Sequence, residues 1–343
     1  MSNDNMGYDY APPERKKKHP VRATIIILVA VVVIAAVVAG GYLLSLAKSF
    51  DNKSQTIESA FPAESARPDK TETGAKNILL LGSDSGGGSG ETENLNGVPN
   101  AGRSDTIMLV HIPANRKDVF VTSIMRDTWV PIPGKRTHKI NAAFSYGGVP
   151  LAVQAIESLL DTRIDHVASI DMKGFKGVTE AIGGVDVDVP ATFTSGYGHY
   201  PFTQGPAHLE GDKALAFVRE RKSFKDGDYQ RVKNQQAFIK AVVAKLLTPE
   251  TLANPAKLSD VVNEISPYIA VDDSLGGAEL GKLGLSLASG RGKDLHFFTL
   301  PTLGVGRSTD GQSIVLPDND AIDELATALQ DDTVDEFVRT HGL

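Results

Sequence analysis

Runs of residues typical of β-strands alternate with segments typical of α-helices between residues 77 and 329, and this alternation constrains the fold most. Strands are predicted by the apolar or alternating runs at 77–82, 106–112, 118–125, 166–170, 185–189 and 295–300. Helices are predicted by the residue patterns at 150–160, 173–182, 212–218, 228–247 and 321–329. Because the two kinds of segment alternate without an internal repeat, the pattern predicts one α/β domain with helices on both faces of a sheet.

A second constraint is an apolar run without any charged residue, from Ala23 to Ala47. With a rise of 1.5 Å per residue, a helix of about 25 residues is roughly 37 Å long, which is enough to cross a bilayer. A cleaved signal peptide is the alternative, but its apolar core is usually only about 7–15 residues long. The basic cluster at 15–22 precedes the run and predicts a cytoplasmic N-terminus.

The chain is therefore expected to be a single-pass protein of the cell membrane with its main domain outside the cell. The predicted parts are a cytoplasmic basic tail at 1–22, a transmembrane helix at 23–47, an extracellular polar stalk at 48–75 and a folded domain at 76–335.

Charge and cysteine content exclude several classes of protein. The net charge is −7 although the tail before the apolar run is basic, so the outer part is more acidic than the whole chain. An acidic domain lacks the basic surface that nucleic-acid binding requires, and no nucleic-acid partner is expected. The chain has no cysteine, which excludes thiol nucleophiles, cysteine-ligated zinc and disulfides.

Aspartates and arginines stand where the predicted strands begin and end. Asp84 follows the first strand, Arg103 and Asp105 precede the second, and Arg126 with Asp127 follows the third. Neighbouring strands bring such residues to one edge of the sheet, where open α/β folds bind their ligands. Arginine forks match phosphate oxygens, and carboxylates are common magnesium ligands, so the set indicates chemistry on a phosphorylated substrate.

A second group of charged residues surrounds the predicted helices at 212–218 and 228–247. Arg219 and Arg221 are two residues apart, so in an extended segment both side chains point the same way. Asp228 is a good N-cap, and Arg231 and Gln235 share one helix face. A cation in the first helical turn opposes the helix dipole, and a bound phosphate would compensate for that cost. The alternative for the whole charged set is a network of surface salt bridges.

Other motifs carry less weight. Ser83 to Gly87 resembles the nucleophile loop of trypsin-like serine proteases, but no histidine base stands in a matching position. The glycine-rich stretch up to Gly90 lacks the Gly-Lys-Ser/Thr that completes a phosphate-binding loop. The eight histidines do not show the spacing of metal ligands.

Short stretches in a fixed order carry a family resemblance. They lie at 77–84, 103–106, 123–128, 139–143, 147–148, 183–187, 209–211, 219–221, 228–231 and 235–236. Together they resemble the LytR–CpsA–Psr family of cell-wall phosphotransferases over residues 76–330. The resemblance implies a three-layer α/β/α domain with a central mixed sheet and a hydrophobic lipid-binding channel.

The same resemblance implies the activity and the roles of the site residues. A glycopolymer with its linking phosphate would pass from a polyprenyl pyrophosphate carrier to a peptidoglycan hydroxyl outside the membrane, releasing polyprenyl phosphate. Mg²⁺ would be held by Asp84 and Asp105. The pyrophosphate would be bound by Arg103, Arg126, Arg219, Arg221, Arg231 and Gln235. The catalytic residues would be Arg126, Asp127, Arg219 and Arg221, with Asp127 or Asp105 accepting the hydroxyl proton.

Two departures from the family pattern bear on donor choice. Asn234 stands where the family commonly has arginine, and the loop after Asp84 is glycine-rich where an arginine is often found. Two other functions use the same residues: a polyprenyl pyrophosphate phosphatase with water as acceptor, and a binder without catalysis. The polymer itself stays open among teichoic acid, arabinogalactan and capsule.

Overall fold

The structure is a computed structural model that describes residues 40–84, 103–246, 248, 251, 254–289 and 294–343. The chain divides into two units, residues 1–45 and residues 46–343. In the part of the chain so described, no helix has both the length and the apolar character needed to cross a bilayer. The transmembrane helix predicted at 23–47 lies mostly outside the described residues, as does the glycine-rich loop after Asp84.

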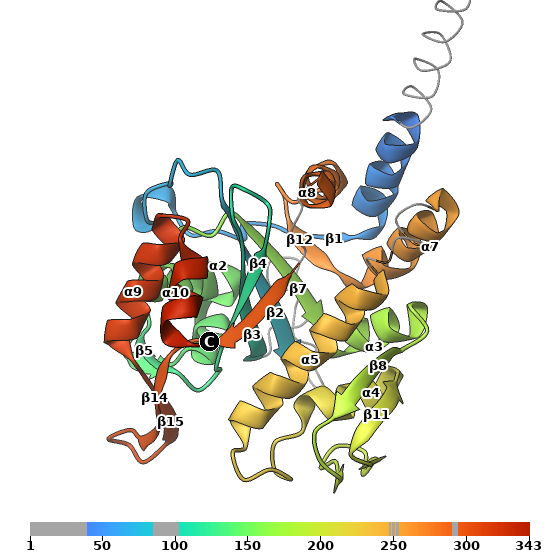
Figure 1. The fold of residues 1–343 in the computed structure, drawn as a ribbon. Helices are drawn as coiled ribbons and strands as arrows, with labels where there is room; N and C mark the ends of the chain where they lie inside the picture. Colours follow the sequence, from blue (N-terminus) through green and yellow to red (C-terminus); the bar gives the residue numbers. More distant parts are fainter. Residues whose placement is uncertain (1–39, 85–102, 247, 249–250, 252–253, 290–293) are drawn as a thin grey trace, which may run out of the picture. The chain divides into compact units, whose positions relative to one another are not determined.

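A mixed sheet of seven strands forms the centre of the second unit (Figure 1). The strand order is β1 (Gln55–Ile57), β12 (Ala270–Asp272), β7 (His166–Asp171), β2 (Lys76–Asp84), β3 (Arg103–Ile112), β4 (Val119–Ile124) and β13 (Leu295–Thr299). The pairs β1–β12, β2–β7 and β4–β13 are parallel, and the other neighbours are antiparallel. The predicted central mixed sheet is confirmed.

Alternating side chains of β2 supply both faces of the sheet. Leu79 and Leu81 are buried in the core on one face, together with residues of α2 (Asn141–Leu160), α9 (Asn319–Gln330) and α10 (Val334–His341). Ile78 and Leu80 belong to a second cluster, which contains residues of α7 (Pro255–Ile265) and α8 (Gly277–Ser289). Helices therefore cover both faces, as the alternation of strands and helices predicts.

A third apolar cluster lies beside the sheet and carries part of the site. It joins α3 (Met172–Ala181), α4 (Gly211–Arg219) and α5 (Asp228–Leu246) to the ribbon of β8 (Val185–Val189) and β11 (Gly205–Leu209). A short pair, β9 (Phe193–Thr194) and β10 (Pro201–Phe202), adds two stacked phenylalanines to this cluster. Because α3 follows β7 directly, the cluster is held close to the sheet edge where the charged residues gather.

Two hairpins border the same edge. β5 (Trp129–Pro131) pairs with β6 (Thr137–Lys139), and β14 (Thr302–Arg307) pairs with β15 (Ser313–Pro317). The backbone N–H of Val315 donates to the carbonyl of Asp127 at 2.9 Å, which joins the second hairpin to the segment after β4. Short 3₁₀ turns lie at Glu64–Ala66 and Ser266–Tyr268, and residues 40–53 before β1 are helical.

The predicted stalk at 48–75 is in part a folded edge of the domain. Strand β1 joins the sheet, and Ile57 and Ala60 are buried in the core. The guanidinium of Arg67 binds the carboxylate of Glu157 at 2.7 Å, with both side chains buried. Apolar residues are sparse in this segment, so its composition does not predict the few buried contacts that attach it to the domain. At the other end of the chain, α10 packs into the core and extends the domain beyond residue 335.

Helix α2 begins at Asn141, well before the helix predicted at 150–160. The helix is kinked at Gly147 and Gly148, and Gly148 adopts a φ of 64°. A kink at two glycines lets Pro150 stand at the start of the second half, where its missing N–H costs little. The prediction therefore captured the second half and missed the first, whose residues line a cavity at the site.

Candidate functional site

The ends of β2, β3 and β4 meet at one edge of the sheet. Asp84 at the end of β2 is the cross-strand partner of Arg103 at the start of β3, as expected for neighbouring strands. The side chains of these two residues lie outside the described part of the structure. Asp105 stands two residues further along β3, and Arg126 and Asp127 follow β4.

Arg126 lies at the centre of an ionic network. Its Nη1 donates to Oδ1 of Asp105 at 2.6 Å. Its Nε lies 3.9 Å from Oδ1 of both Asp127 and Asp228, beyond hydrogen-bond distance. Arg231 in turn donates from Nη2 to Oδ2 of Asp228 at 2.8 Å. The network links Asp105 of β3 and the residues after β4 to the first turn of α5.

The structural role of Asp228 differs from the predicted N-cap. It is the first residue of α5 rather than its N-cap, and its carboxylate binds Arg231 in place of backbone N–H groups. An arginine in the first turn needs a nearby negative charge, because the helix dipole opposes the cation there. Asp228 therefore bridges Arg231 and Arg126.

The two central arginines differ in their electrostatic balance. Burial acts to lower the pKa of Arg126, but the carboxylates of Asp105, Asp228 and Asp127 outweigh it and raise the pKa. Burial lowers the pKa of Arg231, which is only 4% exposed, and the positive charge of Arg126 adds to this effect. Nε of each arginine is buried without a hydrogen-bond partner. An anion bound here would satisfy donors that the protein alone leaves unpaired.

Arg219 and Arg221 approach the site from the end of α4. Arg219 is the last residue of the helix, its Nη1 lies 3.2 Å from Sδ of Met172, and its guanidinium lies over the ring of Tyr197. Glu220 between them is extended, with a ψ of 132°, as the alternation of the two arginines predicts.

Glu220 anchors this segment and was not identified from the sequence as a site residue. Its buried carboxylate accepts from the backbone N–H of Gly196 at 2.5 Å, of Arg221 at 2.9 Å and of Ser223 at 3.0 Å. Burial acts to raise the pKa of Glu220, but the backbone donors outweigh it and the pKa lies below 4.5. The signal in the sequence is an acidic residue between two arginines, but the sequence does not show that this residue is buried.

The replacement Glu220→Gln is expected to destabilise the fold at pH 7 and to have little effect in acid. Because the folded pKa is lowered, the carboxylate contributes stability above its unfolded pKa near 4.5 and loses it as the pH falls through the folded value. The difference in free energy of unfolding between wild type and variant, measured by urea denaturation from pH 7 to pH 3, should therefore shrink. Glu264→Gln, at an exposed position, is the matched control. A difference independent of pH would contradict the assignment.

Amide side chains of α5 hold the end of α4. Nδ2 of Asn234 donates to the carbonyl of Phe217, and Nε2 of Gln235 donates to the carbonyl of Val218, both at 3.3 Å. The last carbonyls of a helix lack partners within it, so these bonds stabilise the helix end that carries Arg219. Asn234 is buried at the helix contact and lines neither cavity described below.

A cavity of about 470 Å³ combines this charged cluster with an apolar wall. Its polar lining includes Asp105, Arg126, Arg219, Arg221, Arg231 and Gln235. Its apolar lining comes from the sheet (Leu80, Met108, Ala168) and from the helices (Phe175, Leu215, Val218, Phe238, Ile239, Val242). The apolar strand residues lie further inside the sheet than the charged ones, so an elongated apolar ligand with an anionic end fits the arrangement.

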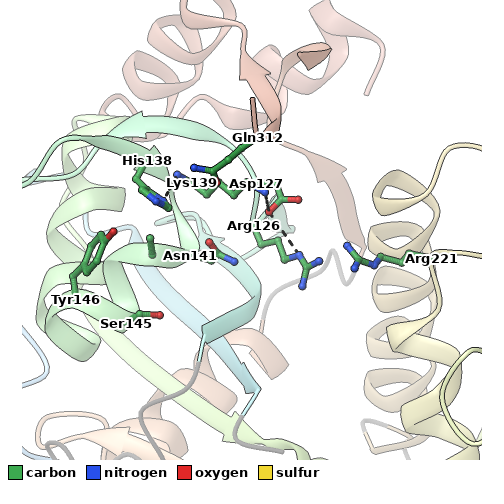
Figure 2. Close-up of a pocket in the computed structure, with 10 residues that line it drawn as sticks. Arg126, Asp127, His138, Lys139, Asn141, Ser145, Tyr146, Arg221 and Gln312 are labelled. Atoms are coloured by element: carbon green, nitrogen blue, oxygen red, sulfur yellow. Dashed lines mark hydrogen bonds and ion pairs between the residues drawn. The ribbon is translucent and has the colours of Figure 1, made fainter. Parts of the chain in front are cut away.

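A second cavity of about 390 Å³ adjoins the first and is polar (Figure 2). Arg126 and Arg221 line both cavities, and Figure 2 shows their guanidinium groups directed toward each other. The other walls come from β6, the first half of α2 and the turn between β14 and β15. The two cavities therefore meet at a pair of arginines.

Comparison with known proteins assigns the chain to a family. The family described as the LytR_cpsA_psr family matches residues 42–331. The chain belongs to the LytR_cpsA_psr family. Among its relatives is a protein of Enterococcus faecalis named polyisoprenyl-teichoic acid–peptidoglycan teichoic acid transferase TagU. The two are 32% identical over 254 residues, which cover 72% of this chain and 76% of that protein.

Solved structures resemble this LytR_cpsA_psr protein over most of its length. The crystal structure of Bacillus subtilis TagV is 27% identical and gives a TM-score of 0.62, covering 77% of this chain and 98% of that one. A LytR-Csp2A-Psr enzyme of Actinomyces oris, 22% identical, gives a TM-score of 0.61 and covers 80% and 95% of the two chains. The similarity to the Actinomyces oris enzyme shows that the two proteins share a fold.

The structure brings most of the predicted site residues of this LytR_cpsA_psr protein together. One cavity is lined by the described side chains of the predicted pyrophosphate set and by Asp105, while Asp127 lines the adjoining cavity. The sequence interpretation did not assign site roles to Ser83 and Ser169, whose buried hydroxyls also line the first cavity without a hydrogen-bond partner. Serines inside strands carry no distinctive sequence signal.

Among the described residues of this LytR_cpsA_psr protein, one group of three side chains has the geometry to hold a metal ion. It consists of Asp118, Asp294 and His296, which lie around the starts of β4 and β13. Arg126 follows the opposite end of β4, so this group is separate from the charged cluster. Exposed acidic groups are common without an ion, and we assign no role to this one.

Proposed function

We propose that the protein transfers a glycopolymer with its linking phosphate from a polyprenyl pyrophosphate carrier to a hydroxyl of peptidoglycan, releasing polyprenyl phosphate. The observation that carries the proposal is that an apolar wall and a cluster of arginines line the same cavity. An isoprenoid chain matches the apolar wall, and a pyrophosphate matches the arginine forks. The name of the Enterococcus faecalis relative supports the same reaction.

The arginines act by placing positive charge where phosphoryl transfer develops negative charge. Such a reaction requires little covalent chemistry from the protein, so catalysis rests on positioning and on electrostatic stabilisation. Arg126 and Arg221 line both cavities and are assigned to the phosphate that carries the glycan. Arg219, Arg231 and Gln235 line only the cavity with the apolar wall and are assigned to the rest of the pyrophosphate. Arg103, which pairs with Asp84 at the start of β3, is proposed as an additional ligand from the family resemblance.

Magnesium forms part of the proposal. Asp105 and Ser83 line the same cavity, and the buried hydroxyl of Ser83 has no hydrogen-bond partner. Carboxylate and hydroxyl oxygens are ligands that Mg²⁺ accepts, so the residues present fit the ion. Asp84, next to Ser83 in β2, and Asp105 would hold it. When bound, the ion supplies positive charge to the phosphate oxygens.

The apolar run at 23–47 and the basic cluster before it support a single membrane anchor with an extracellular domain. Such an anchor suits a substrate whose isoprenoid chain resides in the membrane. We therefore propose that the domain acts at the outer surface of the cell membrane.

The proposal is tested with the full-length protein in detergent micelles. A polyprenyl pyrophosphate glycan labelled in its sugar is incubated with Mg²⁺ and soluble peptidoglycan fragments, and the label is followed by chromatography. Label on the fragments together with free polyprenyl phosphate is the expected result. Release of the label as a phosphorylated glycan without acceptor would indicate the phosphatase. Label that stays on a tightly bound carrier would indicate a binder.

Removal of magnesium is expected to abolish transfer, and Asp105→Asn is expected to weaken the response to the ion. Loss of one charged ligand should raise the Mg²⁺ concentration for half-maximal rate by roughly tenfold, which corresponds to about 1.4 kcal/mol. The check is a Mg²⁺ titration of the transfer rate after treatment with EDTA. Asp323→Asn, which alters an exposed aspartate of α9 that lines neither cavity, is the matched control. An unchanged Mg²⁺ titration in Asp105→Asn would remove this residue from the metal site.

A further inference from the structure

The polar cavity beside Arg126 and Arg221 has the lining expected of a second ligand site. Its wall is formed by His138 and Lys139 of β6, by Asn141, Ser145 and Tyr146 of α2, and by Gln312 of the turn between β14 and β15 (Figure 2). Three separate parts of the chain thus contribute side chains with hydrogen-bonding groups to one space. Convergent polar groups from several elements are typical of a binding pocket.

An aromatic surface forms part of this cavity. The ring of Tyr146 is 46% exposed and meets the ring of His138 edge-on, with their centroids 5.7 Å apart. The ring of Trp129 also lies near that of His138, in a tilted arrangement with a centroid distance of 5.8 Å. A sugar ring has apolar C–H faces that pack on aromatic rings and hydroxyl groups that bind amide and hydroxyl side chains at its edge. Tyr146 and His138, with Asn141 and Gln312 nearby, offer both kinds of contact.

The geometry of phosphoryl transfer indicates whether the polar cavity holds the acceptor sugar or the glycan of the donor. The attacking and leaving oxygens lie roughly in line on opposite sides of the phosphorus. If the phosphorus lies between Arg126 and Arg221, the leaving polyprenyl phosphate occupies the cavity with the apolar wall. The attacking hydroxyl must then come from the other side, which is the polar cavity. The glycan of the donor is a third substituent and is not placed on this line.

We propose that the polar cavity binds the sugar of the peptidoglycan acceptor, with Tyr146 as the platform for its ring and Asp127 as the acceptor of its hydroxyl proton. This inference rests on the proposed transfer reaction. Oδ1 of Asp127 is 3.2 Å from Nζ of Lys139 and 3.9 Å from Nε of Arg126, and these cations fix the carboxylate at the cavity wall.

The proposed step balances as follows. The acceptor oxygen forms a bond to the phosphorus that carries the glycan, and its proton passes to the carboxylate of Asp127. The bond from that phosphorus to the bridging oxygen breaks, and polyprenyl phosphate leaves with the electron pair. The product is a glycan joined to peptidoglycan through a phosphodiester.

The test compares Tyr146→Ala with Tyr146→Phe in the full-length protein in micelles. The alanine variant should raise the KM for soluble peptidoglycan fragments roughly tenfold, the equivalent of about 1.4 kcal/mol, and leave the KM for the donor unchanged. The phenylalanine variant retains the ring face and should stay close to wild type. Tyr146 is exposed, so both variants should unfold at the wild-type temperature. Gln312→Ala, on a different element, should raise the acceptor KM as well.

Each of the other outcomes has a definite meaning. A higher KM for the donor with an unchanged KM for the acceptor would overturn the proposal and assign the cavity to the donor glycan. Unchanged values for both substrates, with wild-type transfer intact, would overturn any sugar site here and leave the proposed function standing. Absence of transfer by the wild type would refute the proposed function, and the acceptor site would fall with it.

Discussion

Replacing Arg221 by alanine is expected to reduce the rate of transfer by roughly 100- to 1,000-fold and to leave the fold intact. Removal of one preorganised donor to a developing oxyanion has an effect of that size in other enzymes. Arg221 is an exposed side chain that lines both cavities, and it faces Arg126 across them (Figure 2). The check is kcat/KM for the labelled donor, together with the midpoint of thermal unfolding.

Lys222→Ala is the matched control, because it removes a positive charge from the next residue, which is exposed and lines neither cavity. Its kcat/KM should stay within a few-fold of wild type. Equal losses in the two variants would indicate a general effect of charge on substrate attraction, and the specific role of Arg221 would be wrong. A fully active Arg221→Ala variant would have the same consequence.

Replacing Ile239 by glutamate is expected to weaken binding of the polyprenyl carrier by at least about 100-fold. Ile239 is half-buried on the apolar wall of the first cavity, between Gln235 and Val242 on the same face of α5. A carboxylate there is hydrated while the cavity is open, so the protein should fold. The bound isoprenoid would exclude that water without offering a partner to the charge, which costs several kcal/mol.

The measurement is equilibrium binding of polyprenyl pyrophosphate and of inorganic pyrophosphate to the same variants. Lys240→Glu introduces a carboxylate at the adjacent exposed position, outside the cavity, and should bind both ligands nearly as wild type does. Ile239→Glu should lose affinity for the carrier and keep most of its affinity for inorganic pyrophosphate. Equal loss for both ligands would show that the apolar wall does not hold the isoprenoid.

The sequence predicts those parts of the fold that repeat a local pattern. The strands β2, β3, β4 and β7 have continuous or alternating apolar residues, and the structure confirms them with small shifts at their ends. Short strands escaped prediction, because β1 and β12 each have three residues, too few to show a period. Their places in the sheet depend on pairing between residues 55–57 and 270–272, which no local pattern encodes.

The same division applies to the site. The positions of Asp105 near the start of a strand and of Arg126 after the next one follow from the sequence, since residues at the ends of strands lie at an edge of the sheet. The bridge from Arg126 to Asp228 and the anchoring of the Arg221 segment by Glu220 join parts of the chain that are distant in sequence. Such contacts arise only when α4 and α5 pack beside the sheet.

The sequence by itself thus determined the α/β class, the family resemblance and the kinds of side chain available for a phosphorylated substrate. Only the tertiary structure decided that two cavities meet at Arg126 and Arg221, one with an apolar wall and one polar. The physical reason is that a cavity is space left unfilled between packed elements. Its shape depends on how α2, α5 and the hairpins are placed around the sheet, and no single segment carries that information.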